Sequence, residues 1–113
     1  MSTLNWVKNR TGVYVVEQGS NSSGRWRRWS DGFLEQWFEE DSKKYTTAGQ
    51  TVSLPKSFTG SGYFVSVRPF STGSFSEFEF RIASRSASSF VVAAHAYSGY
   101  AVNTGILVYA AGY

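Results

Sequence analysis

The chain contains no cysteine, two prolines, one methionine and one histidine among its 113 residues. Without cysteine it can form neither a disulfide nor a thiolate metal site, and one histidine excludes a multi-histidine metal motif within a single chain. No apolar run approaches the roughly 20 residues that a transmembrane helix needs, and the first residues lack the basic-then-apolar order of a signal peptide. We therefore expect a protein with no cofactor, not inserted in a membrane and not exported by a signal peptide.

Aromatic residues, by contrast, are abundant, since Phe, Trp and Tyr together make up 18% of the chain. Side chains of this kind fit the pleated, half-buried surface of a sheet better than they fit a helix. The length corresponds to one domain. We predict an all-β protein, specifically an antiparallel β-sandwich.

The clearest local signal is Asp31-Gly32 between two aromatic-rich runs, which is typical of a two-residue hairpin turn. This turn predicts one register of cross-strand pairs: Trp29 with Leu34, Arg28 with Glu35, Arg27 with Gln36 and Trp26 with Trp37. Large aromatic side chains then lie on both faces of the hairpin. Either the hairpin is central in the fold, or its second face contacts another subunit.

Apolar alternation predicts the remaining strands, at Val13–Gln18, Gln50–Leu54, Tyr63–Phe70, Phe75–Ser84, Phe90–Tyr97 and Gly105–Ala111. Pro69 should mark an edge strand or a strand end. Small polar residues predict a loop over 19–24, and charged residues predict a connector over 39–44. Residues 1–12 are interpreted as a connector or the end of a preceding shaft, and residues 13–113 as the β-sandwich domain.

From Ser86 to Tyr113 the sequence contains no Asp, Glu, Lys or Arg. The solvent face of an antiparallel sheet normally carries such residues. The last two predicted strands therefore belong either to the centre of the sandwich or to an interface between subunits.

Candidate catalytic groups are few. Glu77 and Glu79 lie two apart on a predicted strand, at a spacing that could suit a glycosidase pair, but alternating charge is also how the solvent face of an ordinary strand looks. His95 lies in an apolar strand, and we interpret it as a hydrogen-bonded interior residue, although three copies near a symmetry axis could hold an ion. No nucleophile-elbow motif is present. We predict that the protein is not an enzyme.

Arg25, Arg27 and Arg28 alternate with Trp26 and Trp29, a combination that can bind single-stranded nucleic acid. The net charge is only +3, however, and the predicted strand divides the arginines between two faces. We expect no nucleic-acid partner.

The segment from Ala96 to Thr104 combines tyrosines with small polar residues, as adaptable binding loops do. It could equally be an ordinary hairpin connection. If it binds a ligand, we predict that the contacts come from Tyr97, Tyr100 and Asn103.

Three motifs carry a resemblance to a known family. The first is a hairpin with Trp29-Ser30-Asp31-Gly32 followed by Glu35-Gln36; the second is Thr51-Val52-Ser53-Leu54-Pro55; the third is the ending Tyr109-Ala110-Ala111-Gly112-Tyr113. Together they resemble the C-terminal domain of bacteriophage tail fibre proteins. The chain departs from that pattern at Trp37-Phe38, where the family usually has glycines.

This resemblance implies a trimeric tip domain at the distal end of a virion's tail fibre, which binds a glycan or an outer-membrane component of the host bacterium. The hairpin residues would then have a structural or interface role: Trp26, Arg28, Trp29, Ser30, Asp31, Gly32, Glu35, Gln36 and Trp37. Three alternatives stay open, namely a monomeric carbohydrate-binding module of a secreted or lytic enzyme, a structural cap of the fibre, and an enzyme that cleaves surface polysaccharide.

Overall fold

The computed structural model describes residues 12–70, 78–96 and 102–113. These residues form eight strands: β1 Val15–Asn21, β2 Gly24–Trp29, β3 Leu34–Tyr45, β4 Gln50–Ser53, β5 Phe64–Phe70, β6 Phe78–Arg85, β7 Ser89–Ala96 and β8 Val102–Gly112. Within these ranges there is no helix, and hence none that could span a membrane. The all-β prediction is confirmed.

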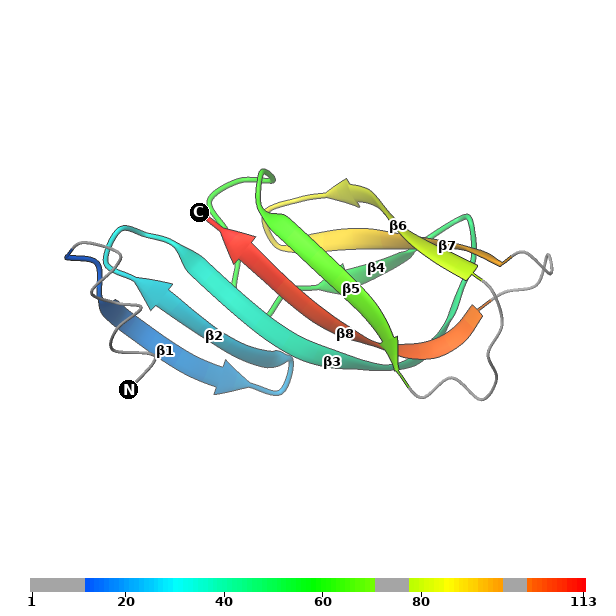
Figure 1. The fold of residues 1–113 in the computed structure, drawn as a ribbon, viewed down its shortest axis with the longest axis horizontal. Helices are drawn as coiled ribbons and strands as arrows, with labels where there is room; N and C mark the ends of the chain where they lie inside the picture. Colours follow the sequence, from blue (N-terminus) through cyan, green and yellow to red (C-terminus); the bar gives the residue numbers. More distant parts are fainter. Residues whose placement is uncertain (1–11, 71–77, 97–101) are drawn as a thin grey trace.

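The strands form two antiparallel sheets that pack as a sandwich (Figure 1). The larger sheet has the order β1-β2-β3-β8-β5, and the smaller has the order β4-β7-β6. The charge-free strands β7 and β8 are therefore each flanked by a strand on both sides. The central position that was one of the two predicted for them is therefore confirmed within each sheet.

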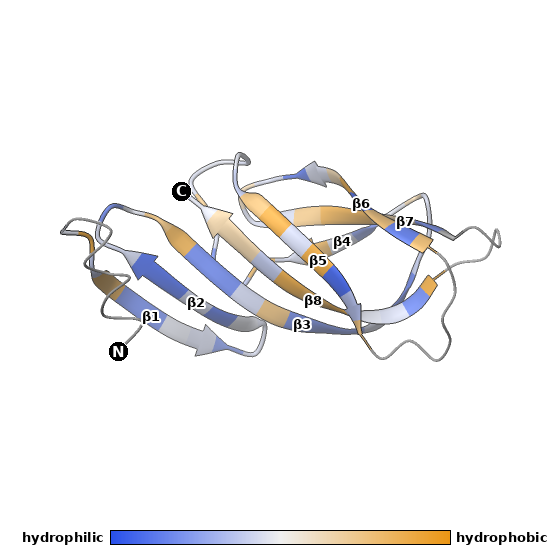
Figure 2. Ribbon diagram, in the orientation of Figure 1, coloured by the Kyte–Doolittle hydropathy of each residue, from blue (hydrophilic) through white to orange (hydrophobic). Residues whose placement is uncertain are grey.

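The core lies between β3, β8 and β5 of the larger sheet and the whole of the smaller sheet. Figure 2 shows hydrophobic residues along β5, β7 and β8, whereas β1 and β2 are mostly hydrophilic. The largest fully buried apolar side chains in this core are Tyr45, Tyr63, Phe90, Leu34 and Ile106. The hairpin β1–β2 extends the larger sheet beyond the part that the smaller sheet covers (Figure 1).

Several predicted strands are confirmed in kind and place, β4, β5, β7 and β8 among them. Pro69 lies in β5, which is an edge strand of the larger sheet, as proline requires. Residues 75–77 of the predicted strand 75–84 and residues 1–11 of the predicted connector 1–12 lie outside the described residues.

Two loop predictions are wrong. The segment 39–44, predicted as a charged connector, is part of the long strand β3, because its backbone pairs with β8 through a bulge between Glu40 and Lys43. The predicted loop over 19–24 is mostly strand and shrinks to Ser22-Ser23. There the side-chain oxygen of Asn21 accepts hydrogen bonds from the backbone N–H groups of Ser23 and Gly24, at 2.8 and 3.1 Å.

The predicted hairpin register is wrong by one residue. Arg27 pairs with Glu35 and Trp26 with Gln36, so the predicted ion pair between Arg28 and Glu35 does not form. The cause is a three-residue loop: Gly32 adopts a φ of +91° and donates to the carbonyl of Trp29 at 2.9 Å. A shift of one residue moves every side chain of one strand to the other face.

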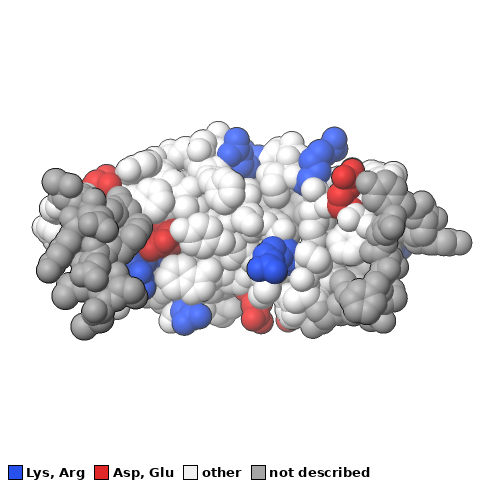
Figure 3. All heavy atoms as spheres, in the orientation of Figure 1, with Lys and Arg blue, Asp and Glu red and all other residues white. Residues whose placement is uncertain are grey.

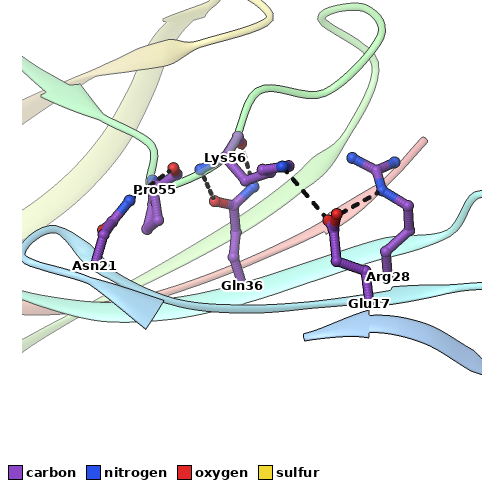
Figure 4. A network of polar contacts seen from close by, with 6 residues as sticks. All are labelled: Glu17, Asn21, Arg28, Gln36, Pro55 and Lys56. Carbon is purple, nitrogen blue, oxygen red and sulfur yellow. Dashed lines mark hydrogen bonds and ion pairs between the residues drawn. The ribbon is translucent and has the colours of Figure 1, made fainter. Parts of the chain in front are cut away.

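Gln36 is fully buried and holds a loop against the hairpin. Its amide oxygen accepts from the backbone N–H of Lys56 at 2.9 Å, and its amide nitrogen donates to the Lys56 carbonyl at 2.8 Å (Figure 4). Lys56 also forms an ion pair with Glu17 at 3.4 Å, and Asn21 donates to the carbonyl of Pro55 at 3.3 Å. The loop after β4 thereby covers the side of the hairpin that the smaller sheet leaves open.

We predict that Gln36→Leu lowers the free energy of unfolding by about 1–3 kcal/mol, because the Lys56 backbone groups lose both partners. Urea unfolding followed by tryptophan fluorescence measures this change. The matched control is Gln18→Leu on the exposed part of β1, which should change stability by no more than about 0.5 kcal/mol. Equal stability of the two variants would contradict the role of Gln36.

Candidate functional site

None of the strands that the structure describes covers the side of the larger sheet that faces away from the smaller sheet. The pairing of β2, β3, β8 and β5 places its side chains in three cross-strand rows. We call them the outer rows: Arg27-Glu35-Ala111-Phe64, Arg25-Trp37-Tyr109-Ser66 and Glu39-Leu107-Arg68. Figure 3 views this side and shows a wide uncharged area with isolated charged groups.

Glu35 is the polar centre of the first two rows. Its Oε1 accepts from the indole N–H of Trp29 at 3.1 Å and lies 3.7 Å from the Arg27 guanidinium. Its Oε2 accepts from the hydroxyl of Tyr109 at 2.9 Å. One carboxylate thus joins β2, β3 and β8 on the outer side.

The turn of the hairpin motif is held by its own polar side chains. The hydroxyl of Ser30 accepts from the backbone N–H of Tyr14 at 3.1 Å, and Asp31 accepts from the N–H of Phe33 at 3.0 Å. With the contacts of Glu35 and Gln36, they connect the motif to Tyr14, to β8 and to the loop after β4.

Two arginines lie over the ring of Trp37. The guanidinium carbons of Arg25 and Arg27 are 5.6 and 5.7 Å from the ring centroid, within cation–π range. Hollows of about 350 and 380 Å³ lie on the two sides of the Arg25–Trp37 pair. The first is lined by Gly24, Arg25, Trp37, Phe38, Glu39, Leu107 and Val108, and the second by Gln18, Gly19, Ser20, Arg25, Trp26, Arg27 and Trp37.

Three large apolar or aromatic side chains of the outer rows are exposed to solvent. Phe64 is 63% exposed, Tyr109 40% and Leu107 37%, and pairing with β8 brings all three to neighbouring positions. Exposed apolar residues scattered singly are common, but adjacent ones indicate a surface that contacts another molecule. On either side of Leu107 lie Glu39 and Arg68, of opposite charge.

The structure locates some of the predicted binding residues. Tyr97 and Tyr100 lie outside the described residues, and Asn103 is exposed near the start of β8, opposite Lys44. Of the paired carboxylates, Glu77 is outside the described residues and Glu79 is exposed on β6.

The interior position expected for His95 is wrong. Its side chain is exposed on the side of β7 that faces away from the core, because Val92 and Ala94 occupy the core side of that strand. No group of three metal-ligating side chains occurs in the described part of the chain.

Sequence reasoning missed the contributions of Phe64, Leu107, Tyr109 and Arg68 to the outer rows. Alternation did indicate that Phe64 and Arg68 share one face of their strand. It could not indicate that β5 and β3 lie on opposite sides of β8, which is what brings these residues together.

Comparison with known proteins finds no matching family profile and no matching curated protein. Solved structures do match. An N-truncated R1-type pyocin tail fibre superimposes with a TM-score of 0.63 at 21% identity, over 97% of this chain and 95% of that one. A C-terminal fragment of the R1 pyocin fibre of P. aeruginosa gives 0.63 at 23% identity, over 87% of this chain and 28% of that one. An N-truncated R2-type pyocin tail fibre gives 0.51 at 20% identity, over 88% of this chain and 39% of that one. The chain therefore has the fold found in these fibres.

The hydroxyl of Tyr109 offers a titration test of the outer rows. Tyr109 is only partly exposed. Its partial burial, and then the hydrogen bond and negative charge of Glu35, raise the pKa of Tyr109 to about 12 from its ordinary value of 10. The stabilisation linked to this group is therefore complete below pH 10 and is lost as the pH rises through 12. We predict that Glu35→Gln lowers the pKa of Tyr109 toward 10, as measured by NMR of the tyrosine ring carbons. The control Glu39→Gln should leave it in place, and an unchanged pKa in Glu35→Gln would refute the assignment.

Proposed function

We propose that this chain is the receptor-binding tip domain of a phage-type tail fibre, which assembles as a homotrimer at the distal end of the fibre and attaches it to a bacterial surface. The observation that carries the proposal is the match to the R1-type pyocin tail fibre over nearly the full length of both chains. The independent sequence motifs of the hairpin and of the chain's last residues support it. The role is adhesion rather than catalysis.

The outer rows are the surface through which we propose that copies of the chain contact one another. Phe64, Leu107 and Tyr109 supply the apolar centre that an interface between subunits requires. Glu39 and Arg68 flank Leu107 with opposite charges, so the same patch on a second copy offers each a partner. The trimeric state itself rests on the family resemblance.

The receptor contacts are proposed at the opposite end of the sandwich from the start of β1, where β7 leads into β8. Asn103 is exposed near the start of β8, and Tyr97 and Tyr100, which precede it in the sequence, are proposed to contribute with it. Three copies of a weak site on one tip, and several fibres on one particle, raise the avidity well above the affinity of a single site.

The self-association is tested by light scattering coupled to size exclusion. We expect the purified chain to have three times the mass of 12.6 kDa, and Leu107→Glu to shift it to a lower mass because a carboxylate then lies in the apolar centre. The control is Thr51→Glu, an exposed position on the smaller sheet, which should leave the assembly unchanged. A wild-type monomer at all concentrations would refute self-association of this chain, and a trimeric Leu107→Glu would refute the role of the outer rows.

Receptor binding is tested by adsorption of the fluorescently labelled chain to bacterial cells. We expect the double substitution Tyr97→Ala and Tyr100→Ala to reduce the bound fraction while the thermal transition stays where it is. A lowered thermal transition would instead make the two tyrosines part of the core, and full adsorption by the variant would exclude them from the contact.

A further inference from the structure

The outer side of the smaller sheet carries a hollow of about 250 Å³ that none of the roles above uses. It is lined by Thr47, Glu79, Arg81, Ala93, Ala94 and His95. The residues come from β6, β7 and the turn between β3 and β4, which meet at the end of the sandwich where β7 ends (Figure 1).

The hollow exists because a small residue lies between taller neighbours. Val92 and Ala94 point into the core, so Ala93 points outward by the alternation of the strand. Ala93 is nevertheless only 4% exposed, although it lines the hollow. On one side the turn is fixed to β7 by the hydrogen bond from the N–H of Ala94 to the carbonyl of Thr46, at 2.9 Å.

The walls of the hollow combine donors and acceptors. Glu79 pairs with His95 in the strand register, and Arg81 pairs with Ala93, so a carboxylate and a guanidinium stand side by side on β6. Neither the carboxylate of Glu79 nor the guanidinium of Arg81 forms a hydrogen bond or ion pair with any other residue that the structure describes. Both charged groups are thus available to a ligand, with the hydroxyl of Thr47 across the hollow.

The side chains that line the hollow disfavour metal ions, simple anions and apolar molecules as ligands. A metal ion would need at least three ligating side chains, which the described residues do not bring together. A simple anion would face the carboxylate of Glu79, and an apolar molecule would leave two charges without water or partner. A ligand that presents hydroxyl groups as both donors and acceptors around a compact body satisfies all the walls at once.

We propose that this hollow binds one sugar ring of a bacterial surface glycan, with the ring lying on Ala93 and its hydroxyl groups bound by Glu79 and Arg81. The inference rests on the proposed receptor-binding function. Of the two receptor classes that the resemblance implies it selects the glycan, and it adds a place where one sugar ring would bind. His95 lies two residues before Tyr97, so the sugar site adjoins the end of the sandwich proposed for receptor contact.

The test is an NMR titration of the full chain, recorded on its backbone amides, with the methyl glycosides of glucose, galactose, mannose and N-acetylglucosamine. Acyclic sorbitol serves as the control probe. We expect at least one glycoside to cause saturable shifts centred on Thr47, Arg81 and Ala93. Ala93→Leu fills the hollow from its floor and should abolish them, and Glu79→Gln should weaken binding by about tenfold. Thr51→Leu, elsewhere on the same side of the smaller sheet, should bind as the wild type does.

Three results would overturn the sugar site: no saturable shift with any of the four glycosides, shifts centred on the outer rows, or unchanged binding in a folded Ala93→Leu variant. Cell adsorption measured in parallel separates the two proposals. Wild-type chain that binds a glycoside but no cells refutes the receptor-binding function alone. Chain that adsorbs to cells equally with and without Ala93→Leu refutes the sugar site alone.

Discussion

The pairing of β3 with β8 is the constraint on which the rest of the molecule depends. It joins Leu34–Tyr45 to Val102–Gly112, so the larger sheet cannot be completed until two segments far apart in the sequence meet. The hairpin β1–β2 connects to the sandwich through β3, and β5 connects to the larger sheet through β8. The outer rows exist only because β3 and β5 flank the same strand. Such long-range pairing favours slow folding.

The sequence was sufficient to predict the class of fold and the place of most strands, because apolar alternation follows directly from burial on one face. The sequence was not sufficient to predict which residues pair across the hairpin β2–β3. Asp31-Gly32 fits both a two-residue and a three-residue loop, and only the positive φ of Gly32 distinguishes them. Nor did the charges of 39–44 predict a strand. This segment pairs with β8 but extends past β2, and it carries its charges on largely exposed positions.

For the candidate sites too, the sequence predicts features set by neighbouring residues but not contacts between residues far apart in the chain. Glu35 and Gln36 were recognised as part of a motif, but their partners Tyr109 and Lys56 lie 74 and 20 residues away, and no local pattern points to them. The hollow on the smaller sheet depends on Ala93 lying between β6 and the turn after β3, a juxtaposition that only the strand order creates. For His95, the apolar neighbours suggested an interior position, although they describe the opposite face of the same strand.

The direction of the strands has a mechanical consequence. The start of β1 and the end of β7 lie at opposite ends of the long axis, and the strands of the larger sheet run obliquely along that axis (Figure 1). A pull between these two ends therefore loads the β2–β3 and β3–β8 hydrogen bonds largely in shear, so that many must break together rather than one after another. A domain built in this way should resist a sudden pull between these ends more than one whose hydrogen bonds are loaded one at a time.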